Sequence, residues 1–211
     1  MMKQAISSNA FLLAAAAIIC TGLIAIVNGL TQPMIAQQQQ KALLKTLNQL
    51  IPENLYDNDI VATCFTVTDQ ELLGSVEPRQ VFIARKEQND VAVMIETNTM
   101  RGYSGEIKMV VGIFENATIA GVRVISHTET PGLGDKIQIN KSDWIESFAN
   151  KSYQESQQSR WEVKKNGGDF DAFTGATITP RAVIFAVKDA LIYFEKNKDQ
   201  LFSHQANCGE S

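Results

Sequence analysis

A long apolar run near the N-terminus limits how this chain can fold and where it can reside. The run extends from Ala10 to Leu30, carries no charge, and has Thr21 and Asn28 as its clearly polar members. A helix of this length would be about 30 Å long, which matches the hydrocarbon thickness of a bilayer. The sequence therefore predicts a transmembrane helix.

A cleaved signal peptide is the alternative interpretation, because Lys3 supplies a short basic segment before the run. The run is longer than the roughly 7 to 15 apolar residues of a signal peptide, and no A-x-A cleavage site follows it. We therefore predict a retained anchor. Lys3 precedes the span and a Gln-rich segment follows it, so the positive-inside rule favours a cytoplasmic N-terminus.

This orientation predicts one anchor followed by a domain outside the cytoplasm. Beyond the span, apolar residues recur at helical spacing as far as Pro52 and predict a linker helix, whereas the polar C-terminal tail is expected to be loose. The predicted segments are 1–9 (cytoplasmic), 10–30 (transmembrane), 31–54 (linker helix), 55–196 (folded domain) and 197–211 (tail).

Charge and cysteine content narrow the classes of function. The net charge is -4 and Lys and Arg form no block, so we expect no nucleic-acid surface, which needs clustered cations. Cys20 lies inside the span, and Cys64 and Cys208 lack the spacing of a metal site. Those two can pair in an oxidising compartment, but two free thiols are the simpler interpretation.

The middle of the chain is rich in strand-like segments. Glu115-Asn116 is predicted to be a hairpin turn, Ser142 to cap a short helix, and Thr179-Pro180 to start a C-terminal amphipathic helix. A sheet with few helices and no regular βαβ alternation predicts an α+β fold with a mixed or antiparallel sheet. The strand-like segments are CFTVTD (from Cys64), QVFIARK (from Gln80), VAVMIETNTM (from Val91), GEIKMVVGIF (from Gly105), TIAGVRVISHTET (from Thr118) and WEVKK (from Trp161).

The segment DAFTGATITP, from Asp171 to Pro180, suggests where chemistry takes place. Gly175 and Ala176 form a side-chain-poor turn that a bulky group can approach. A helix that starts directly afterwards would direct free N–H groups and the positive end of its dipole toward the same place. This arrangement favours a phosphate, although many helix N-termini with Thr caps bind nothing.

The same segment resembles a known attachment motif for flavin. Asp-x-x-Ser/Thr-Gly-Ala-Thr is the sequence to which a flavin transferase attaches FMN, and here it runs from Asp171 to Thr177. The resemblance implies a covalent phosphoester between FMN and Thr177, with Thr174 at the variable Ser/Thr position. It also implies that the transferase, which uses FAD and a divalent cation, recognises Asp171.

Two further segments resemble the same family. GYSGEIK from Gly102 is similar to its Gly-Tyr-x-Gly motif, and SHTETPGLGDKI from Ser126 is similar to its Glu-Thr-Pro-Gly-Leu-Gly loop, whose glycines and N–H groups we expect to cover the flavin ring. The family is the FMN-binding domain shared by the G subunit of the Rnf electron-transport complex and the C subunit of the sodium-pumping NADH:quinone reductase. The cofactor-binding residues implied are Thr177, Thr174, Gly175, Ala176, Thr130, Leu133, Gly134 and Tyr103.

The resemblance also implies a cellular role. The chain would be a single-pass protein of the bacterial inner membrane, with residues 55–196 as a periplasmic FMN-binding domain. It would relay electrons among other membrane subunits of a complex that couples ferredoxin–NAD redox chemistry to ion movement. By itself, the chain would not turn over a soluble substrate.

Other chemistry lacks the residues it would need. His127 and His204 are the only histidines, and the chain has neither a G-x-S-x-G nucleophile elbow nor a Rossmann glycine fingerprint. We expect no metal site. Two alternatives stay open: a membrane-anchored, non-redox binding or assembly module, and a stand-alone flavin-dependent reductase.

Overall fold

The computed structural model describes residues 2–208 and divides after Lys45 into two compact units. The first unit consists of most of helix α1 (Met2–Leu50). Its segment Leu13–Gln32 has a mean hydropathy of 2.2, and no part of that segment is buried. By length and composition it is able to span a membrane, close to the predicted 10–30.

The two threonines of α1 that lie in or next to this segment keep their hydroxyls satisfied inside the helix. Thr21 Oγ1 donates to the carbonyl of Ala17 at 2.8 Å, and Thr31 Oγ1 donates to the carbonyl of Val27 at 2.9 Å. Polar groups in a lipid environment need partners within the protein, because the bilayer core offers none. These bonds make the apolar segment compatible with lipid despite its threonines.

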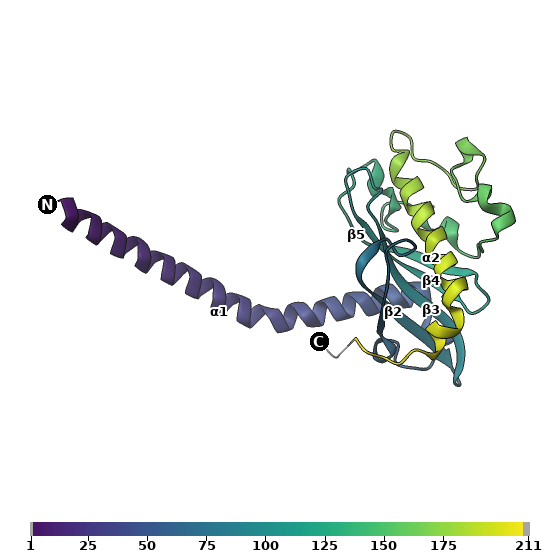
Figure 1. Cartoon of the computed structure of the whole chain (residues 1–211), viewed down its shortest axis with the longest axis horizontal. Coiled ribbons are helices and arrows are strands. Elements are labelled where there is room, and N and C mark those ends of the chain that lie inside the picture. The colour runs from purple at the N-terminus through teal and green to yellow at the C-terminus, as the bar shows by residue number, and fades with distance from the viewer. Residues whose placement is uncertain (1, 209–211) are drawn as a thin grey trace. The chain divides into compact units, whose positions relative to one another are not determined.

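The second unit is built on a five-stranded sheet in which every strand pair is antiparallel and neighbours in sequence are neighbours in space (Figure 1). This confirms the predicted α+β class. Five of the six predicted strand segments are correct. The strands are β1 (Phe65–Asp69), β2 (Ser75–Lys86), β3 (Asn89–Thr99), β4 (Ile107–Phe114) and β5 (Ile119–His127).

Helix α2 (Ile178–Ser203) covers one face of this sheet and forms the main core with it. Val183, Val187 and Leu191 on α2 are fully buried, as are Val93 and Ile95 on β3. Because side chains alternate between the faces of a strand, the intervening residues point to the opposite face. Burial of the apolar stripe on α2 fixes the helix on the sheet and so places its N-terminus.

The end of α1 packs on the opposite face. Gly112 on β4 and Gly121 on β5 are direct partners in the sheet. A Cβ atom at Gly112 would lie 3.3 Å from Leu50 Cβ, and one at Gly121 would lie 3.2 Å from Leu50 Cδ2. The two glycines therefore leave room for Leu50, which is 3% exposed. The helix ends at Leu50 rather than at Pro52, and Glu53–Leu55 form a short 3-10 turn, η1.

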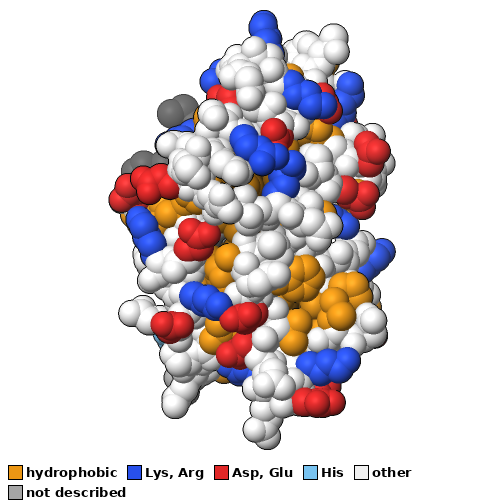
Figure 2. All heavy atoms as spheres, turned by 90° about the vertical axis from the view of Figure 1, so that its right-hand side faces the viewer, with side chains coloured by type: hydrophobic (Ala, Val, Ile, Leu, Met, Phe, Trp, Pro, Cys, Tyr) orange, Lys and Arg blue, Asp and Glu red, His pale blue; other side chains and the backbone are white. Residues whose placement is uncertain are grey.

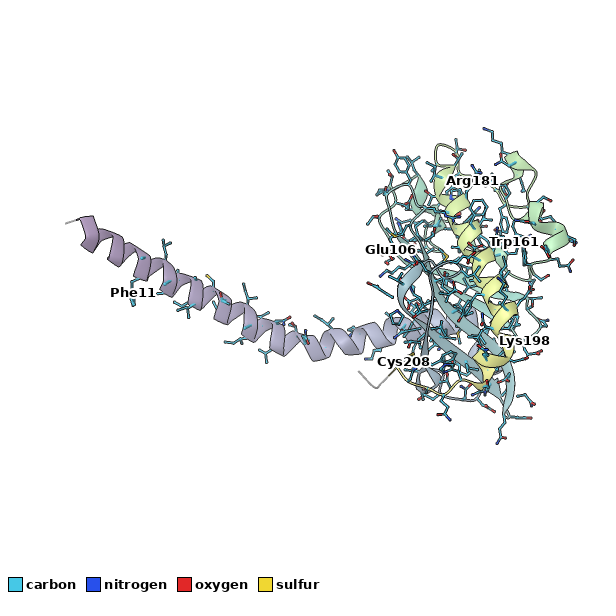
Figure 3. All side chains as sticks on the ribbon, in the orientation of Figure 1. Phe11, Glu106, Trp161, Arg181, Lys198 and Cys208 are labelled. Carbon is cyan, nitrogen blue, oxygen red and sulfur yellow. A yellow bond between two sulfur atoms is a disulfide. The ribbon has the colours of Figure 1, made fainter. Side chains whose placement is uncertain are left out.

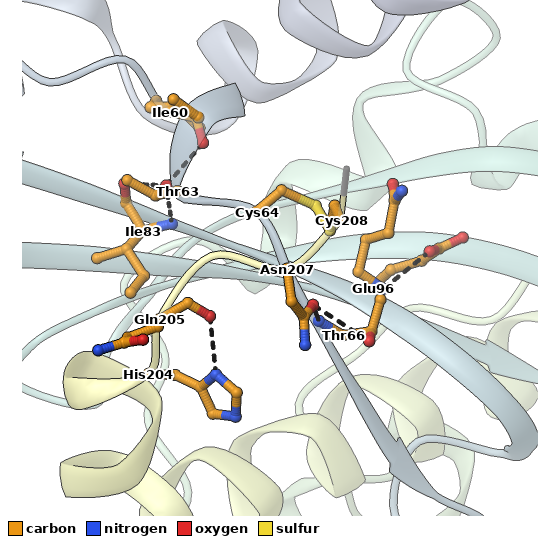
Figure 4. The surroundings of a disulfide bond; sticks show 12 residues. Ile60, Thr63, Cys64, Thr66, Ile83, Glu96, His204, Gln205, Asn207 and Cys208 are labelled. Carbon is orange, nitrogen blue, oxygen red and sulfur yellow. Dashed lines mark hydrogen bonds between the residues drawn. A yellow bond between two sulfur atoms is a disulfide. The ribbon is translucent and has the colours of Figure 1, made fainter. Parts of the chain in front are cut away.

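The C-terminal segment differs from its prediction. We expected residues 197–211 to be a loose tail and Cys64 and Cys208 to be free thiols, and both expectations are wrong for the residues described; 209–211 lie outside them. Helix α2 continues to Ser203, and a disulfide joins Cys64 to Cys208 (Figure 4). The N–H groups of Asn207 and Cys208 donate to the carbonyl of Cys64 at 2.9 and 3.2 Å.

A set of 3-10 turns connects β5 to α2. Ser142 caps one of them, η4 (Asp143–Phe148), as predicted, by accepting from the N–H of Trp144 at 3.1 Å. The predicted WEVKK strand is wrong: Lys164–Asn166 is a 3-10 turn, η6, and only Val163 forms an isolated bridge, to Phe170. The other turns of the folded unit are η2 (Val61–Thr63), η3 (Gly134–Ile137) and η5 (Glu155–Arg160).

Figure 2 shows the face of this unit that lies on the right-hand side of Figure 1. Lys and Arg side chains are interspersed there with Asp and Glu, and apolar side chains are visible between them. Interspersed charges give no extended region of positive potential on this face.

Candidate functional site

Three segments that are far apart in the sequence meet at one pocket. It has a volume of about 340 Å³, within the range of small-molecule and cofactor sites. Seven of the eight predicted cofactor-binding residues line it; Thr174 does not. The lining residues are Tyr103, Glu129, Thr130, Leu133, Gly134, Gly175, Ala176, Thr177, Ile178 and Thr179.

The turn before α2 is held by one backbone hydrogen bond and by the buried side chain of Phe173. The N–H of Ala176 donates to the carbonyl of Phe173 at 3.1 Å, and Gly175 between them has a φ of +82, which a side chain would strain. Phe173 is buried and packs edge-on against Trp144 with ring centroids 5.0 Å apart. Trp144 Nε1 also donates to the carbonyl of Asp171 at 2.7 Å. Thr174, in the same turn, stays exposed.

Thr177 stands at the N-terminus of α2 with its side chain exposed. It occupies the N-cap position, but its hydroxyl makes no capping hydrogen bond. The N–H groups of Ile178 and Thr179 fall in the first turn, where they have no acceptor within the helix. The positive end of a long helix thus coincides with an accessible hydroxyl, which suits a phosphate group attached there.

The prediction that Thr179 caps this helix and Pro180 begins it is wrong. The helix begins at Ile178, and the Thr179 hydroxyl donates instead to Glu129 Oε2. Thr179 is fully buried, so its hydroxyl needs a buried acceptor, and Glu129 supplies one. Glu129 Oε1 also accepts from the N–H of Ser104 at 3.0 Å.

The Thr130–Gly134 loop lines the pocket, but two of its N–H groups form hydrogen bonds within the loop itself. The N–H groups of Leu133 and Gly134 donate to the carbonyl of Thr130, both at 3.1 Å, and that of Asp135 donates to it at 3.4 Å. We expected the N–H groups of this loop to be free for the flavin ring, and for Leu133 and Gly134 that expectation is wrong. The loop instead offers the pocket the Leu133 side chain and the small surface of Gly134.

An ion pair fixes the first turns of α2 to the preceding segment. Arg181 Nε lies 3.1 Å from Glu162 Oε1; Figure 3 shows Arg181 on the helix and Trp161 on the neighbouring segment. Burial raises the pKa of Glu162, but hydrogen bonds from the Val163 N–H and from Arg181, with the charge of Arg181, outweigh it and leave the pKa lowered. Glu162 therefore stays ionised at neutral pH and the pair persists.

Asp171 lies outside the pocket on the surface. Its side chain is 69% exposed and pairs with Lys164 Nζ at 2.8 Å. An exposed carboxylate at the start of the motif is accessible to another protein. Among the described residues, no cluster of three or more His, Cys, Asp or Glu is arranged to hold a metal ion.

Three of the lining residues, Glu129, Ile178 and Thr179, were not among the predicted cofactor-binding residues. Ile178 and Thr179 directly follow the motif and would have been found by extending it into the first turn of the helix. Glu129 begins the Glu-Thr-Pro-Gly-Leu-Gly segment, but its part in the pocket depends on contacts with residues 25 and 50 positions away. Local sequence patterns do not predict contacts between residues so far apart in the chain.

Comparison with known proteins agrees with this geometry. Residues 102–192 match the FMN-binding domain family, and residues 1–50 match the RnfG N-terminal region. The chain is 47% identical over 207 residues to the G subunit of the ion-translocating oxidoreductase complex of Shewanella baltica, covering 98% of both chains. The G subunit of the same complex in Vibrio atlanticus is also 47% identical, over 208 residues and 99% of both chains.

The chain belongs to the family of G subunits of ion-translocating oxidoreductase complexes. The G subunit of Pseudoalteromonas atlantica is likewise 47% identical, over 98% of this chain and 96% of its own. All residues that line the pocket fall inside the part that matches the FMN-binding domain. The pocket therefore lies within the part of the chain that is similar to FMN-binding domains.

Proposed function

We propose that this chain is a membrane-anchored electron carrier that holds FMN by a phosphoester on Thr177. It relays electrons inside a membrane complex that couples ferredoxin–NAD redox chemistry to ion translocation. The observation that carries the proposal is the convergence of three separate motifs on one pocket, with the exposed Thr177 hydroxyl at the start of α2.

Attachment is a transfer of FMN from FAD by a flavin transferase. The Thr177 oxygen attacks the phosphorus on the FMN side of the FAD pyrophosphate; the new P–O bond forms, AMP leaves, and the threonine proton is released. Asp171 at the surface serves recognition by the transferase. The tether keeps the cofactor on the protein in every redox state, in a compartment without a free flavin supply.

Each part of the pocket has a distinct task in this proposal. The first turn of α2 would stabilise the charge of a phosphate on Thr177, and the small residues Gly175 and Ala176 would leave room for the rest of the cofactor. Tyr103, 69% exposed, and Leu133, 41% exposed, form apolar walls at the rim and leave the site open toward a partner. When bound, the flavin supplies the redox chemistry, and the protein sets its position and potential.

Partners follow from the proposed role. The relatives are named as subunits of an ion-translocating oxidoreductase complex, and we infer that this chain works with the other membrane subunits of such a complex. The residues that line the pocket include Glu129, whose two oxygens both accept hydrogen bonds, and no His, Cys, Lys or Asp. We therefore expect the isolated chain to show no turnover with a soluble substrate.

The relay itself is tested in the assembled complex by rapid mixing with the electron donor. We expect the absorbance of the flavin on this chain to bleach before the final acceptor is reduced and to recover at least as fast as steady-state turnover. A matched complex carrying Thr177→Ala should assemble but lose its electron transfer. Full activity of that variant complex would favour the non-redox assembly module, and turnover by the isolated chain would favour the stand-alone reductase.

We also infer that the folded unit lies on the periplasmic side of the inner membrane. The Cys64–Cys208 disulfide suits an oxidising compartment, and Lys3, which precedes the apolar segment in the sequence, suits a cytoplasmic N-terminus. Protease added to spheroplasts is expected to digest the folded unit, whereas inside-out vesicles should protect it. The reverse pattern would place the domain in the cytoplasm.

A further inference from the structure

We propose that Glu129 is the positioning residue that holds the three segments of the FMN pocket together. This inference rests on the proposed function. Glu129 is 4% exposed and lines the pocket. A buried carboxylate at a cofactor site is costly unless its oxygens are hydrogen-bonded, so its partners indicate what it is there to hold.

Each carboxylate oxygen bonds a different segment. Oε1 accepts from the N–H of Ser104, which lies in the Gly102–Gly105 turn. Oε2 accepts from the hydroxyl of Thr179, which lies in the first turn of α2, two residues after Thr177. Glu129 itself begins the Glu-Thr-Pro-Gly-Leu-Gly loop. Its side chain thus links all three motifs, and both described partners are neutral donors rather than cations.

Two glycines leave the space that this side chain occupies. A Cβ atom at Gly102 would lie 2.3 Å from the carbonyl oxygen of Gly105 and 2.7 Å from Glu129 Oε1. One at Gly134 would lie 2.8 Å from Oε2, and also 2.9 Å from both Glu129 Cβ and Thr179 Oγ1. Neither glycine has a positive φ, so it is the missing side chain rather than the backbone conformation that matters at these two positions.

The backbone of Glu129 is fixed as well. Its N–H donates to Nδ1 of His127 at 3.0 Å, and the hydroxyl of Thr128 donates to the carbonyl of Ser104 at 2.9 Å. Two hydrogen bonds, one to the Ser104 carbonyl from Thr128 and one from the Ser104 N–H to Glu129, therefore join this segment to the Gly102–Gly105 turn. Loss of the side chain removes the link to α2 and leaves the Thr179 hydroxyl buried without its acceptor.

The consequence is a defined relation between Thr177 and the rest of the pocket. In addition to the buried stripe of α2, the two hydrogen bonds of Glu129 hold the start of the helix against the segments that carry Tyr103 and Leu133. Glutamine can replace them: its carbonyl accepts from the Ser104 N–H, and its amide donates to the Thr179 oxygen. Alanine cannot.

The test uses the full-length chain in detergent, with purified flavin transferase and FAD. We expect Glu129→Ala to incorporate FMN at least tenfold more slowly than the wild type, and Glu129→Gln to stay within threefold of it. Thr179→Val should slow incorporation and Thr179→Ser should restore it. Once loaded, Glu129→Ala should also show lower flavin fluorescence anisotropy and a shifted midpoint potential, because its flavin is held less firmly.

Ile113→Val, a substitution in the core outside the pocket, controls for lost stability. The assignment would be overturned if Glu129→Ala matched this control in its rate of FMN incorporation, its flavin fluorescence anisotropy and its midpoint potential. It would also be overturned if Glu129→Ala and Glu129→Gln slowed FMN incorporation equally, because glutamine can keep both hydrogen bonds. A wild-type chain that takes up no FMN would instead refute the proposed function, so the two failures are distinguishable.

Discussion

Replacement of Thr177 by alanine is expected to abolish covalently bound flavin, whereas Thr174→Ala should retain most of it. The Thr177 hydroxyl lines the pocket at the N-terminus of α2 and makes no capping bond, while Thr174 lies outside the pocket. The measurement is in-gel flavin fluorescence after co-expression with the transferase and full denaturation. Thr177→Ser keeps a hydroxyl and should give a fluorescent band.

Folding controls make this result interpretable. Thr177 is exposed and its side chain bonds no backbone group of the helix, so alanine should change the melting temperature of the flavin-free chain by at most a few degrees. A dark Thr177→Ala band from a folded chain then reports the missing hydroxyl. Fluorescence that survives in Thr177→Ala and disappears in Thr174→Ala would move the attachment to Thr174.

Removal of the disulfide is expected to destabilise the folded unit by about 2–5 kcal/mol. Cys64 and Cys208 are separated by 144 residues, and closing so long a loop lowers the entropy of the unfolded chain substantially. The bond also fixes the segment after α2, where His204 stacks on Phe65 with ring centroids 4.4 Å apart. The measurement compares the free energy of unfolding in denaturant of the wild type and of Cys64→Ser, each with and without reductant.

Cys20→Ser is the matched control, because Cys20 is a free thiol in the apolar segment of α1. It should leave stability unchanged, and the wild-type chain purified without reductant should expose one alkylatable thiol after unfolding. Three alkylatable thiols, or equal stability of Cys64→Ser and Cys20→Ser, would contradict both the disulfide and the compartment inferred from it.

Local patterns predicted most of the fold correctly. The strands alternate or run continuously apolar between clear turns, and Glu115-Asn116 lies in the hairpin turn between β4 and β5, as expected. The strand prediction for WEVKK was wrong because this segment has no partner strand. Only Val163 forms a bridge, to Phe170. Strand pairing is a tertiary property, and five residues cannot specify it.

In the candidate site, too, the residues of local motifs were predictable and the long-range contacts were not. Thr177, Gly175 and Ala176 were predicted from one contiguous motif, and they line one pocket with Tyr103 and Leu133. The long-range contacts were not predictable from local patterns. Glu129 bonds Thr179, and Cys64 pairs with Cys208, only because the fold brings these distant residues together. The prediction of a loose tail was wrong for the same reason. The C-terminal segment is polar, as a loose tail would be, but the disulfide to the distant Cys64 holds it in place.

The covalent attachment is tested most directly by the mass of the peptide that contains Thr177. The wild-type protein is isolated from its own membrane, denatured, digested and fragmented in a mass spectrometer. We predict a mass increase equal to FMN minus water on Thr177, with Thr174 and the rest of the peptide unmodified. An unmodified Thr177 peptide, from protein whose flavin is released by the denaturant or resides on another residue, would contradict the proposal.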